Sequence, residues 1–411
     1  MKRDWKILRG LAYQYADVMR GERNARAKQL HIASNDLHML RPVVRIEELP
    51  WGQLNVDGAL DCECEDEDLR GAEAQLRELL LRARYFSVDH IMPEFVRVWK
   101  REHWHDDGMR IADHSLAGET GTSVASHEYA DQLEDEAALE NVHTPRLSYD
   151  REETMRVFAK LGEALGDILP VKLTSADQWY CAPWDVIARF RGVTPLLMDL
   201  YDRPEYSHRI ARHFYEREKA VMAQREALGL LDGHMDAVNQ TPALTNDLPV
   251  PEAGETVTRK NMWLRGTAQI FGSVSPEMHE AFDIQYISEL AKDCGLVYYG
   301  CCEPLDTKID IVAKIPNLRK IGCSPWANVD SLTEQVGGRY VVAFKPNPAL
   351  LATPTLHEEE ARKNIQQALE AAKRNGVRGM DIVMKDISTV AHNPQNLFRW
   401  AEIAMELVES W

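Results

Sequence analysis

Short apolar segments alternate with longer amphipathic ones from residue 296 to residue 408, and this alternation restricts the possible folds more than any other feature. The apolar segments have the length of buried strands, and the amphipathic segments have the spacing of helices. Strands that alternate with helices through short connections predict a parallel sheet covered by helices. We expect strands over 296–300, 318–323, 339–344 and 380–384, and helices over 306–315, 329–336, 358–375 and 394–408.

Side chains that are capable of chemistry follow each of these expected strands. In a parallel barrel the carboxyl ends of all strands form one face, and the active site lies on that face. A doubly wound open sheet binds ligands near a switch point, and the sequence has no Gly-rich dinucleotide fingerprint. We therefore predict an α/β fold, a (β/α)8 TIM barrel with an N-terminal helical extension. The residues in question are Cys301, Cys302 and Glu303 after the first strand, Trp326 after the second, Lys345 and Asn347 after the third, and Lys385 and Asp386 after the fourth.

The 411 residues are enough for one large domain or for two to three ordinary ones. Residues 1–84 are expected to form the N-terminal helical extension, because their apolar residues have helical spacing. Such a stripe needs a partner surface, so the extension is expected to be a cap or a dimer element, and a homodimer is one expectation. Residues 85–411 are expected to form the barrel, with an irregular polar excursion over 101–145 that acts as a lid.

The charge balance excludes some classes of partner. Lys and Arg number 48 against 65 Asp and Glu, which gives a net charge of −17. A field of this sign repels nucleic-acid phosphates and anionic membranes, so we expect no nucleic-acid or membrane partner. The sequence shows no secretory signal and no long apolar run, which predicts a cytoplasmic protein. Seven cysteines do not suggest a disulfide framework, but they leave room for metal or redox chemistry.

The adjacent cysteines are the strongest candidates for chemistry. A thiolate is a good nucleophile and a soft ligand for zinc, and the carboxylate of Glu303 can complete a metal shell or act as a base. Alternatively, Cys301 and Cys302 are small fillers of the barrel mouth. Two prolines stiffen the loop that carries Lys345, which suits donors held against an anion, although a solvated lysine is equally consistent.

Other candidates come from the loops and the polar excursion. Lys385 and Asp386 either form an ion pair with each other, or Asp386 supplies a ligand carboxylate. His127 is a candidate ligand contact or a surface histidine. Trp184 and Trp326 are candidate walls of an aromatic substrate pocket, or anchors of their loops.

Several motifs together resemble the uroporphyrinogen decarboxylase superfamily, in the branch close to corrinoid-dependent methyltransferases. The resemblance implies a (β/α)8 barrel. Porphyrin decarboxylation is not expected, because the chain lacks the Arg-rich N-terminal signature that holds porphyrin carboxylates. The motifs are GLVYYGCCEPLD (295–306), IPNLRKIGCSPWANV (315–329), GGRYVVAFKPNPALL (337–351) and DIVMKDIST (381–389), with ELPWGQLNVDG (48–58), APWDVIARFRG (182–192) and MDLYDRPEYSHRI (198–210) upstream.

The methyltransferase branch binds zinc through a His-x-Cys pair and a later Cys, and the resemblance places Tyr299, Cys301 and Asp386 at these positions. It therefore implies a zinc site that keeps one thiolate of the family pattern and adds oxygen ligands, which would be a stronger Lewis acid than a thiolate-rich site. The implied metal ligands are Cys301, Cys302, Glu303 and Asp386, the implied catalytic residues are Tyr299, Glu303, Lys345 and Asp386, and the implied substrate contacts are Trp184, Trp326, Asn347 and His127.

The resemblance implies an enzyme that moves a methyl group from a small methylated substrate, such as a methoxylated aromatic, to the cobalt of a separate corrinoid protein. Cobalamin is expected on a partner because the Asp-x-His-x-x-Gly pattern of a corrinoid-binding domain is absent. This transferase would catalyse metal-assisted O-demethylation. Two alternatives stay open: methyl transfer from a methylcorrinoid to a thiol or folate, and a non-catalytic barrel that binds a corrinoid or tetrapyrrole.

Overall fold

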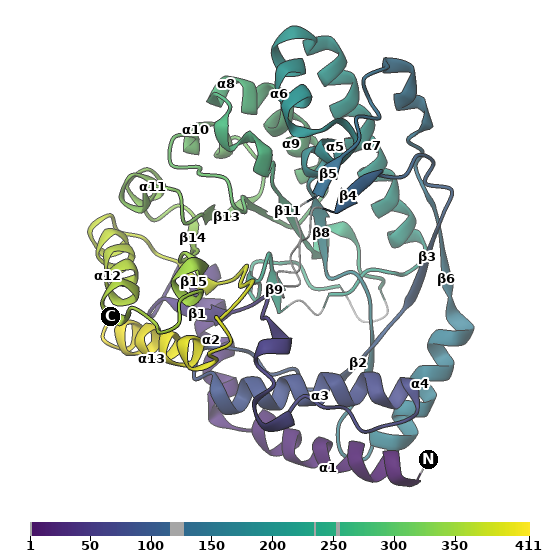
Figure 1. The fold of residues 1–411 in the computed structure, drawn as a ribbon, viewed down its shortest axis with the longest axis vertical. Helices are drawn as coiled ribbons and strands as arrows, with labels where there is room; N and C mark the ends of the chain where they lie inside the picture. The colour runs from purple at the N-terminus through teal and green to yellow at the C-terminus, as the bar shows by residue number, and fades with distance from the viewer. Residues whose placement is uncertain (1, 116–126, 234–235, 252–254) are drawn as a thin grey trace.

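A parallel sheet of seven strands forms the centre of the protein and curls around a concave side (Figure 1). The computed structural model describes residues 2–115, 127–233, 236–251 and 255–411. All neighbouring strands of this sheet run parallel, and β12 is buried along its whole length. In sheet order the strands are β1 (Val43–Ile46), β15 (Met380–Met384), β14 (Val341–Phe344), β13 (Leu318–Cys323), β12 (Leu296–Tyr299), β11 (Trp263–Gly266) and β8 (Gln178–Cys181).

Helices cover the convex side of the sheet, as Figure 1 shows for the C-terminal half. Their starts follow ordinary capping chemistry: the Ser275 hydroxyl caps the first α-helix after β11, and the Asn328 side chain caps the α-helix after β13. The helices are α5 (Pro183–Arg191), α6 (Val193–Asp202), α7 (Pro204–Ala227), α8 (Pro276–His279), a π-helical turn (Glu280–Ile284), α9 (Gln285–Ala291), α10 (Ile309–Val312), α11 (Val329–Val336), α12 (Glu358–Arg374) and α13 (Gln395–Glu409).

The α/β prediction is confirmed, and the four C-terminal strands lie where the sequence predicts them. A closed eight-stranded barrel is not seen in the described residues, because the main sheet ends at β1 and β8. Two further parallel strands, β2 (Val96–Trp99) and β7 (Val171–Thr174), pair with each other instead of joining the main sheet. The architecture is therefore a curled parallel sheet with helices outside.

A two-stranded hairpin, β9 (Ala237–Val238) and β10 (Thr241–Pro242), lies on the concave side of the sheet (Figure 1). The Lys320 ammonium of β13 donates to the Pro242 carbonyl at 2.6 Å and pairs with the buried Asp381 carboxylate at 2.5 Å. The Asn239 amide donates to the Gly300 carbonyl at 3.0 Å. These contacts hold the hairpin close to the carboxyl end of β12.

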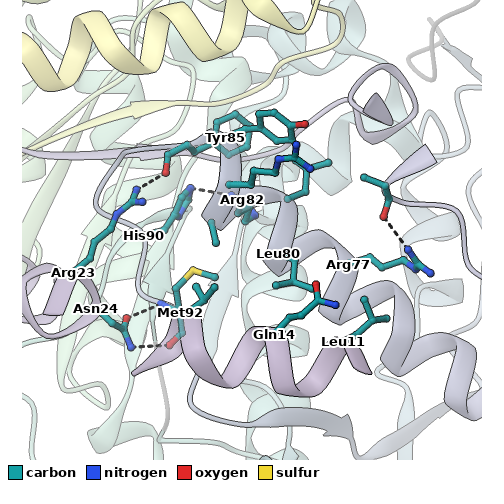
Figure 2. A pocket seen from close by; sticks show the side chains of 16 residues that line it. Leu11, Gln14, Arg23, Asn24, Arg77, Leu80, Arg82, Tyr85, His90 and Met92 are labelled. Carbon is teal, nitrogen blue, oxygen red and sulfur yellow. Dashed lines mark hydrogen bonds between the residues drawn. The ribbon is translucent and has the colours of Figure 1, made fainter. Parts of the chain in front are cut away.

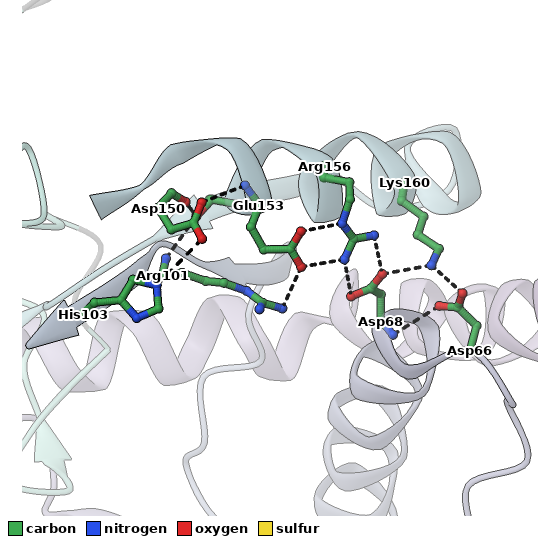
Figure 3. Close-up of polar contacts among 9 residues, drawn as sticks. Asp66, Asp68, Arg101, His103, Asp150, Glu153, Arg156 and Lys160 are labelled. Carbon is green, nitrogen blue, oxygen red and sulfur yellow. Dashed lines mark hydrogen bonds and ion pairs between the residues drawn. The ribbon is translucent and has the colours of Figure 1, made fainter. Parts of the chain in front are cut away.

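Residues 2–85 contribute the helices α1 (Lys2–Met19), α2 (Glu22–Asn35) and α3 (Glu67–Tyr85). Helices α1 and α3 pack with α4 (Arg151–Leu165) around a second apolar cluster. The stretch 1–84 is not only a helical extension, because it also supplies β1 to the main sheet. Figure 3 shows the charged contacts that join α3 to α4, in which Asp68 accepts from Arg156 at 2.8 Å and from Lys160 at 2.8 Å.

The polar excursion contains regular structure that its sequence did not predict. Strand β3 (Arg101–His105) pairs antiparallel with β6 (Arg146–Asp150), and β4 (Asp113–Ser115) pairs with β5 (His127–Tyr129). Most of these side chains are exposed, so the strands show no apolar alternation. The excursion is therefore not irregular, although residues 116–126 of it lie outside the described part of the chain. Short 3-10 helices span Trp51–Gln53, Val56–Gly58, Glu136–Asn141, Arg259–Asn261, Gln269–Ser273 and Pro348–Leu351.

Among the helices that the structure describes, none combines the length and the apolar character needed to cross a membrane.

Candidate functional site

The first candidate, Cys301, lies directly after β12, where the backbone makes a turn that only glycine adopts easily. Gly300 has φ = 107°, and a Cβ there would lie 2.7 Å from the Leu305 side chain. This turn buries Cys301 at the carboxyl end of the sheet, where it is 4% exposed. A buried thiol at a strand end is the setting in which a parallel sheet places its chemistry.

Three cations from three different strands surround Cys301. The Lys385 ammonium, after β15, lies 3.7 Å from the Cys301 sulfur, and the Arg265 guanidinium, on β11, lies 4.0 Å from it. The Lys345 ammonium, after β14, donates to the Cys301 carbonyl at 2.8 Å. We call Arg265, Lys345 and Lys385 the cation cluster. Lys345 and Lys385 are both buried, so water screens their charges only weakly.

The cation cluster favours a thiolate at Cys301. A hydrogen bond from the Cys302 thiol, 3.7 Å away, and the charges of the cluster lower the pKa of Cys301 to about 4 against the opposing effect of burial. The same hydrogen bond and burial raise the pKa of Cys302, so Cys302 keeps its proton. The cations and the Cys302 thiol thus favour the thiolate form of Cys301.

The Glu303 carboxylate joins the ends of two strands through hydrogen bonds. Its carboxylate accepts from the Thr267 hydroxyl at 2.7 Å and from the backbone amides of Cys301 at 2.8 Å and Ala268 at 3.3 Å. Burial raises the pKa of Glu303. These contacts tie the loop after β11 to the loop after β12, which is a positioning role.

Two acidic residues meet at the ends of β1 and β15. Glu48 and Asp386 both have left-handed backbone conformations, with φ of 51° and 57°, which cost energy for residues other than glycine. The Asp386 amide donates to Glu48 at 3.1 Å, and Lys385 lies 3.2 Å from the Asp386 carboxylate. Burial and a hydrogen bond with Asp386 raise the pKa of Glu48, whereas that bond and the Lys385 charge lower the pKa of Asp386 despite burial. Glu48 therefore binds a proton more readily than Asp386 does, and its carboxyl group lies 3.5 Å from the Lys385 ammonium.

Asp185 supplies a fourth carboxyl group near Cys301. Asp185, in the first turn of α5, accepts from the Gln269 side chain at 2.7 Å and from the Gln269 amide at 3.0 Å. Burial raises the pKa of Asp185 to about 6, and the negative charges of Glu303 and Cys301 act in the same direction. A carboxyl group with this pKa can hold a proton near neutral pH and release it.

Of the four expected metal ligands, Cys302 lies near Cys301 and Asp386, whereas Glu303 is turned away to protein donors. No group of three or more His, Cys, Asp or Glu side chains lies close enough to hold a metal ion anywhere in the residues described. The Glu303 carboxylate is already bonded to protein donors. A divalent cation beside Cys301 would also meet the cation cluster. The residues present therefore do not fit the predicted zinc site.

Tyr299 and Trp184 lie away from the cation cluster. The Tyr299 hydroxyl contacts the His279 ring at 2.6 Å and the Asp283 carboxylate, on the helical side of the sheet. It is fully buried, and neighbouring residues of a strand point to opposite faces, so it does not share the concave side with Tyr298. Trp184 is 1% exposed, and its ring nitrogen donates to the Phe282 carbonyl at 2.8 Å. These positions correct the expected catalytic role of Tyr299 and the expected substrate contact of Trp184.

The remaining expected substrate contacts have different surroundings. Trp326 is 69% exposed in the loop after β13, where it is free to meet a ligand. Asn347 caps the short helix Pro348–Leu351, because its side chain accepts from the Ala349 amide at 2.9 Å. His127 lies on the exposed β4–β5 ladder, where its ring contacts the Asp113 carboxylate and not the cation cluster.

Sequence reasoning missed Arg265, Asp185 and Glu48 as site residues. The strand that carries Arg265 reads WLRG, so a charged residue interrupts the apolar run that would have marked it. Glu48 and Asp185 both lie inside the motifs that carry the family resemblance. Glu48 lies just after β1, and Asp185 lies in the first turn of the helix that follows β8. These positions near strand ends are the signal that could have identified the two residues.

A cavity of about 480 Å³ lies elsewhere, between α1, α3 and the segment 86–92 (Figure 2). Its polar lining is already bonded within the protein: Arg23 donates to the Val88 carbonyl at 2.8 Å, and Asn24 donates to the Met92 carbonyl at 3.1 Å. Arg82 donates to the Ile46 carbonyl at 2.8 Å. We therefore place the candidate site at the strand ends and not in this cavity.

Comparison with known proteins gives little further information. No family model matches the chain, and no curated protein matches it. Among solved structures, the chain is similar to a methyltransferase from Methanosarcina mazei, with 13% sequence identity and a TM-score of 0.49 over 93% of this chain and 98% of that one. A likeness at this level does not identify the activity of the chain.

Proposed function

We propose that this protein is a methyltransferase that moves a methyl group from a small methylated substrate to the cobalt of a corrinoid carried by a separate protein. The observation that carries the proposal is the convergence of Arg265, Lys345 and Lys385 at the carboxyl ends of parallel strands. The sequence resemblance supports the reaction class. The curled sheet is then a variant of the (β/α)8 barrel that the resemblance implies.

The cation cluster suits a reaction that leaves negative charge on oxygen. In transfer from a methyl ether, the carbon–oxygen bond breaks, the methyl carbon forms a bond to cobalt, and the electron pair of the broken bond stays on the oxygen. The reduced corrinoid would supply the nucleophile. Fixed positive charges in a buried site stabilise a developing oxyanion without reorganisation, and such stabilisation accounts for much of the rate enhancement of many enzymes. Lys385 and Arg265 are placed for this task.

Two protein carboxyl groups can then protonate the oxygen. Asp185 has a raised pKa, and Glu48 shares a hydrogen bond with Asp386 beside Lys385. Glu303 and Lys345 hold the strand-end loops through their bonds to the backbone at residue 301. In this arrangement the protein supplies both charge stabilisation and a proton, and no step requires the metal that the sequence led us to expect.

Other expectations stay proposals. We expect the corrinoid to come from a partner protein and the methyl donor to be a small molecule such as a methoxylated aromatic. A cytoplasmic location and a homodimer also stay predictions.

The test is anaerobic incubation of the purified protein with a corrinoid protein in the cob(I) state and methoxylated aromatics, followed by absorbance of the methylated corrinoid. We expect methylation with the wild type, a rate that falls at least about tenfold with Lys385→Met, and a smaller fall with Lys385→Arg. A metal chelator should leave the rate unchanged. Absence of methylated corrinoid with every donor would refute the proposal, and a chelator-sensitive rate that zinc restores would refute its metal-free form.

A further inference from the structure

The cavity between α1, α3 and the segment 86–92 has the size of a small-molecule site (Figure 2). Its volume of about 480 Å³ falls within the range of about 300–1,000 Å³ that is usual for ligand pockets. Leu11, Gln14 and Val18 line it from one face of α1, because residues three and four positions apart share a helix face. The C-terminal half of α3 and the segment 86–92 complete the walls.

The cavity has a buried apolar floor and exposed cations at its edge. Leu81, Phe86 and Met92 are buried, whereas Arg23 and Arg84 are exposed. Several polar side chains of the walls donate to backbone carbonyls of the protein itself. The floor therefore suits a ligand with an apolar body, and the edge suits a polar head.

The charges of the lining have one sign. The described residues that line the cavity include four arginines and no Asp or Glu, although Asp and Glu outnumber Lys and Arg in the whole chain by 65 to 48. Carboxylates from outside the lining pair with Arg77 at 2.7 Å and with Arg82 at 3.2 Å. Arg84 stands over the Tyr85 ring, 5.1 Å from its centroid. The remaining arginine of the lining is Arg23.

Arg23 has no carboxylate partner. Among the described residues none forms an ion pair with it, and the carboxylate whose charge acts on it, that of Asp89, is bonded to both terminal nitrogens of Arg41 at 2.7 and 2.8 Å. The hydrogen bonds of Arg23 to the Phe86 and Val88 carbonyls both start from Nη2, so Nη1 and Nε stay available. Partial burial lowers the pKa of Arg23, as expected for a cation that has lost part of its water.

We propose that this cavity binds a linear aliphatic carboxylate, with its carboxylate on Arg23 and its alkyl chain between α1 and α3. Figure 2 shows Arg23 at one end of the cavity, Leu11 at the other end, and Met92 and Leu80 between them. A guanidinium with free donors matches one carboxylate, and the apolar walls match an alkyl chain. The site is separate from the cation cluster, so the inference goes beyond the proposed function and does not depend on it.

The test is calorimetric binding of hexanoate, octanoate and the neutral octanamide to the purified protein. We expect octanoate to bind at least about tenfold more tightly than octanamide, because only the anion pairs with Arg23. Octanoate should also bind at least about fourfold more tightly than hexanoate, since burial of a single CH₂ group gives about that factor. Arg23→Gln should remove the preference for octanoate over octanamide. Arg26→Gln is the matched control, because Arg26 is exposed on the same helix, α2, and does not line the cavity.

A second variant tests the location. Ala83 lines the cavity, so Ala83→Phe should fill part of it and abolish the binding of octanoate, while circular dichroism shows that the variant is folded. Binding of octanamide by Arg23→Gln likewise shows that this variant is folded. No binding of octanoate, equal binding of octanoate and octanamide by the wild type, or an unchanged preference in Arg23→Gln would overturn the inference. Unchanged octanoate binding by folded Ala83→Phe would also overturn it.

Discussion

Removal of the positive charge of Lys385 should raise the pKa of Cys301. Lys385 lies 3.7 Å from the Cys301 sulfur, and two unit charges at about 4 Å interact with about 4 kcal/mol at an effective dielectric constant of about 20. The carboxyl groups of Asp386 and Glu48, at 3.2 Å and 3.5 Å from the Lys385 ammonium, offset part of this effect. Opposite charges at such distances shift a pKa by about one to three units.

In Lys385→Met the pKa of Cys301 should therefore rise from about 4 to about 5–7. The direction follows because the lysine stabilises the charged thiolate, so its loss favours the protonated form. Lys385→Arg keeps the charge and should leave the pKa near that of the wild type.

The assay is the ultraviolet absorbance of the thiolate as a function of pH, taken as the difference between each variant and the same variant with Cys301→Ser. This subtraction removes the other cysteines and the tyrosines. Circular dichroism over the same range defines where the protein stays folded. A wild-type Cys301 that titrates near 9, or identical curves for Lys385→Met and Lys385→Arg, would show that the cation cluster does not control the thiol.

Four further predictions concern the fold, the proton donor and the metal. Trp184→Ala should lower the free energy of unfolding by about 3–5 kcal/mol in denaturant titrations, because the ring is buried, whereas the same change at exposed Trp326 should cost less than about 0.5 kcal/mol. Asp66→Ala should cost about 1 kcal/mol in the same titration, because Asp66 caps α3; a neutral result would contradict this role. If Asp185 supplies the proton, the rate of methyl transfer should fall as pH rises through about 6, because its pKa is about 6 and only the protonated form donates; Asp185→Asn should remove this limb of the pH profile. Metal analysis of the purified protein should find no stoichiometric zinc bound through Cys301. Zinc that the wild type binds and Cys301→Ala loses would show that the predicted metal site exists.

Strands β12 and β14 were predictable because each is an apolar run buried on both faces, as parallel strands covered by helices are, and β13 and β15, which carry Lys320 and Asp381, were predictable from their place in the alternation of strands and helices. Strands β8 and β11 were not predicted, because Tyr180 and Arg265 point into the site and break the apolar pattern. Arg265, which interrupts the apolar run of β11, belongs to the cation cluster of the candidate site. Local pattern and global fold disagree most often at functional positions.

The site was predictable only in part. The rule that strand ends share one face predicted Cys301, Lys345 and Lys385 together, and the structure does bring them together. Successive side chains of a strand point to opposite faces of the sheet. In β12, Tyr298 therefore faces the concave side, whereas Tyr299 faces the helices. The loop after β12 turns Glu303 inward to Thr267, which no sequence pattern indicated.

The most direct test of the central claim is a single turnover with 4-methoxybenzoate that carries an isotopic label in its methyl group, with a cob(I) corrinoid protein as acceptor. For the wild type we predict that the label appears on cobalt as an equal amount of demethylated phenol forms. Lys345→Met should lose this transfer, because the loop at Cys301 and the charge of the cation cluster both depend on Lys345. Labelled cobalt at the same rate in Lys345→Met, or no label on cobalt in the wild type, would contradict the account.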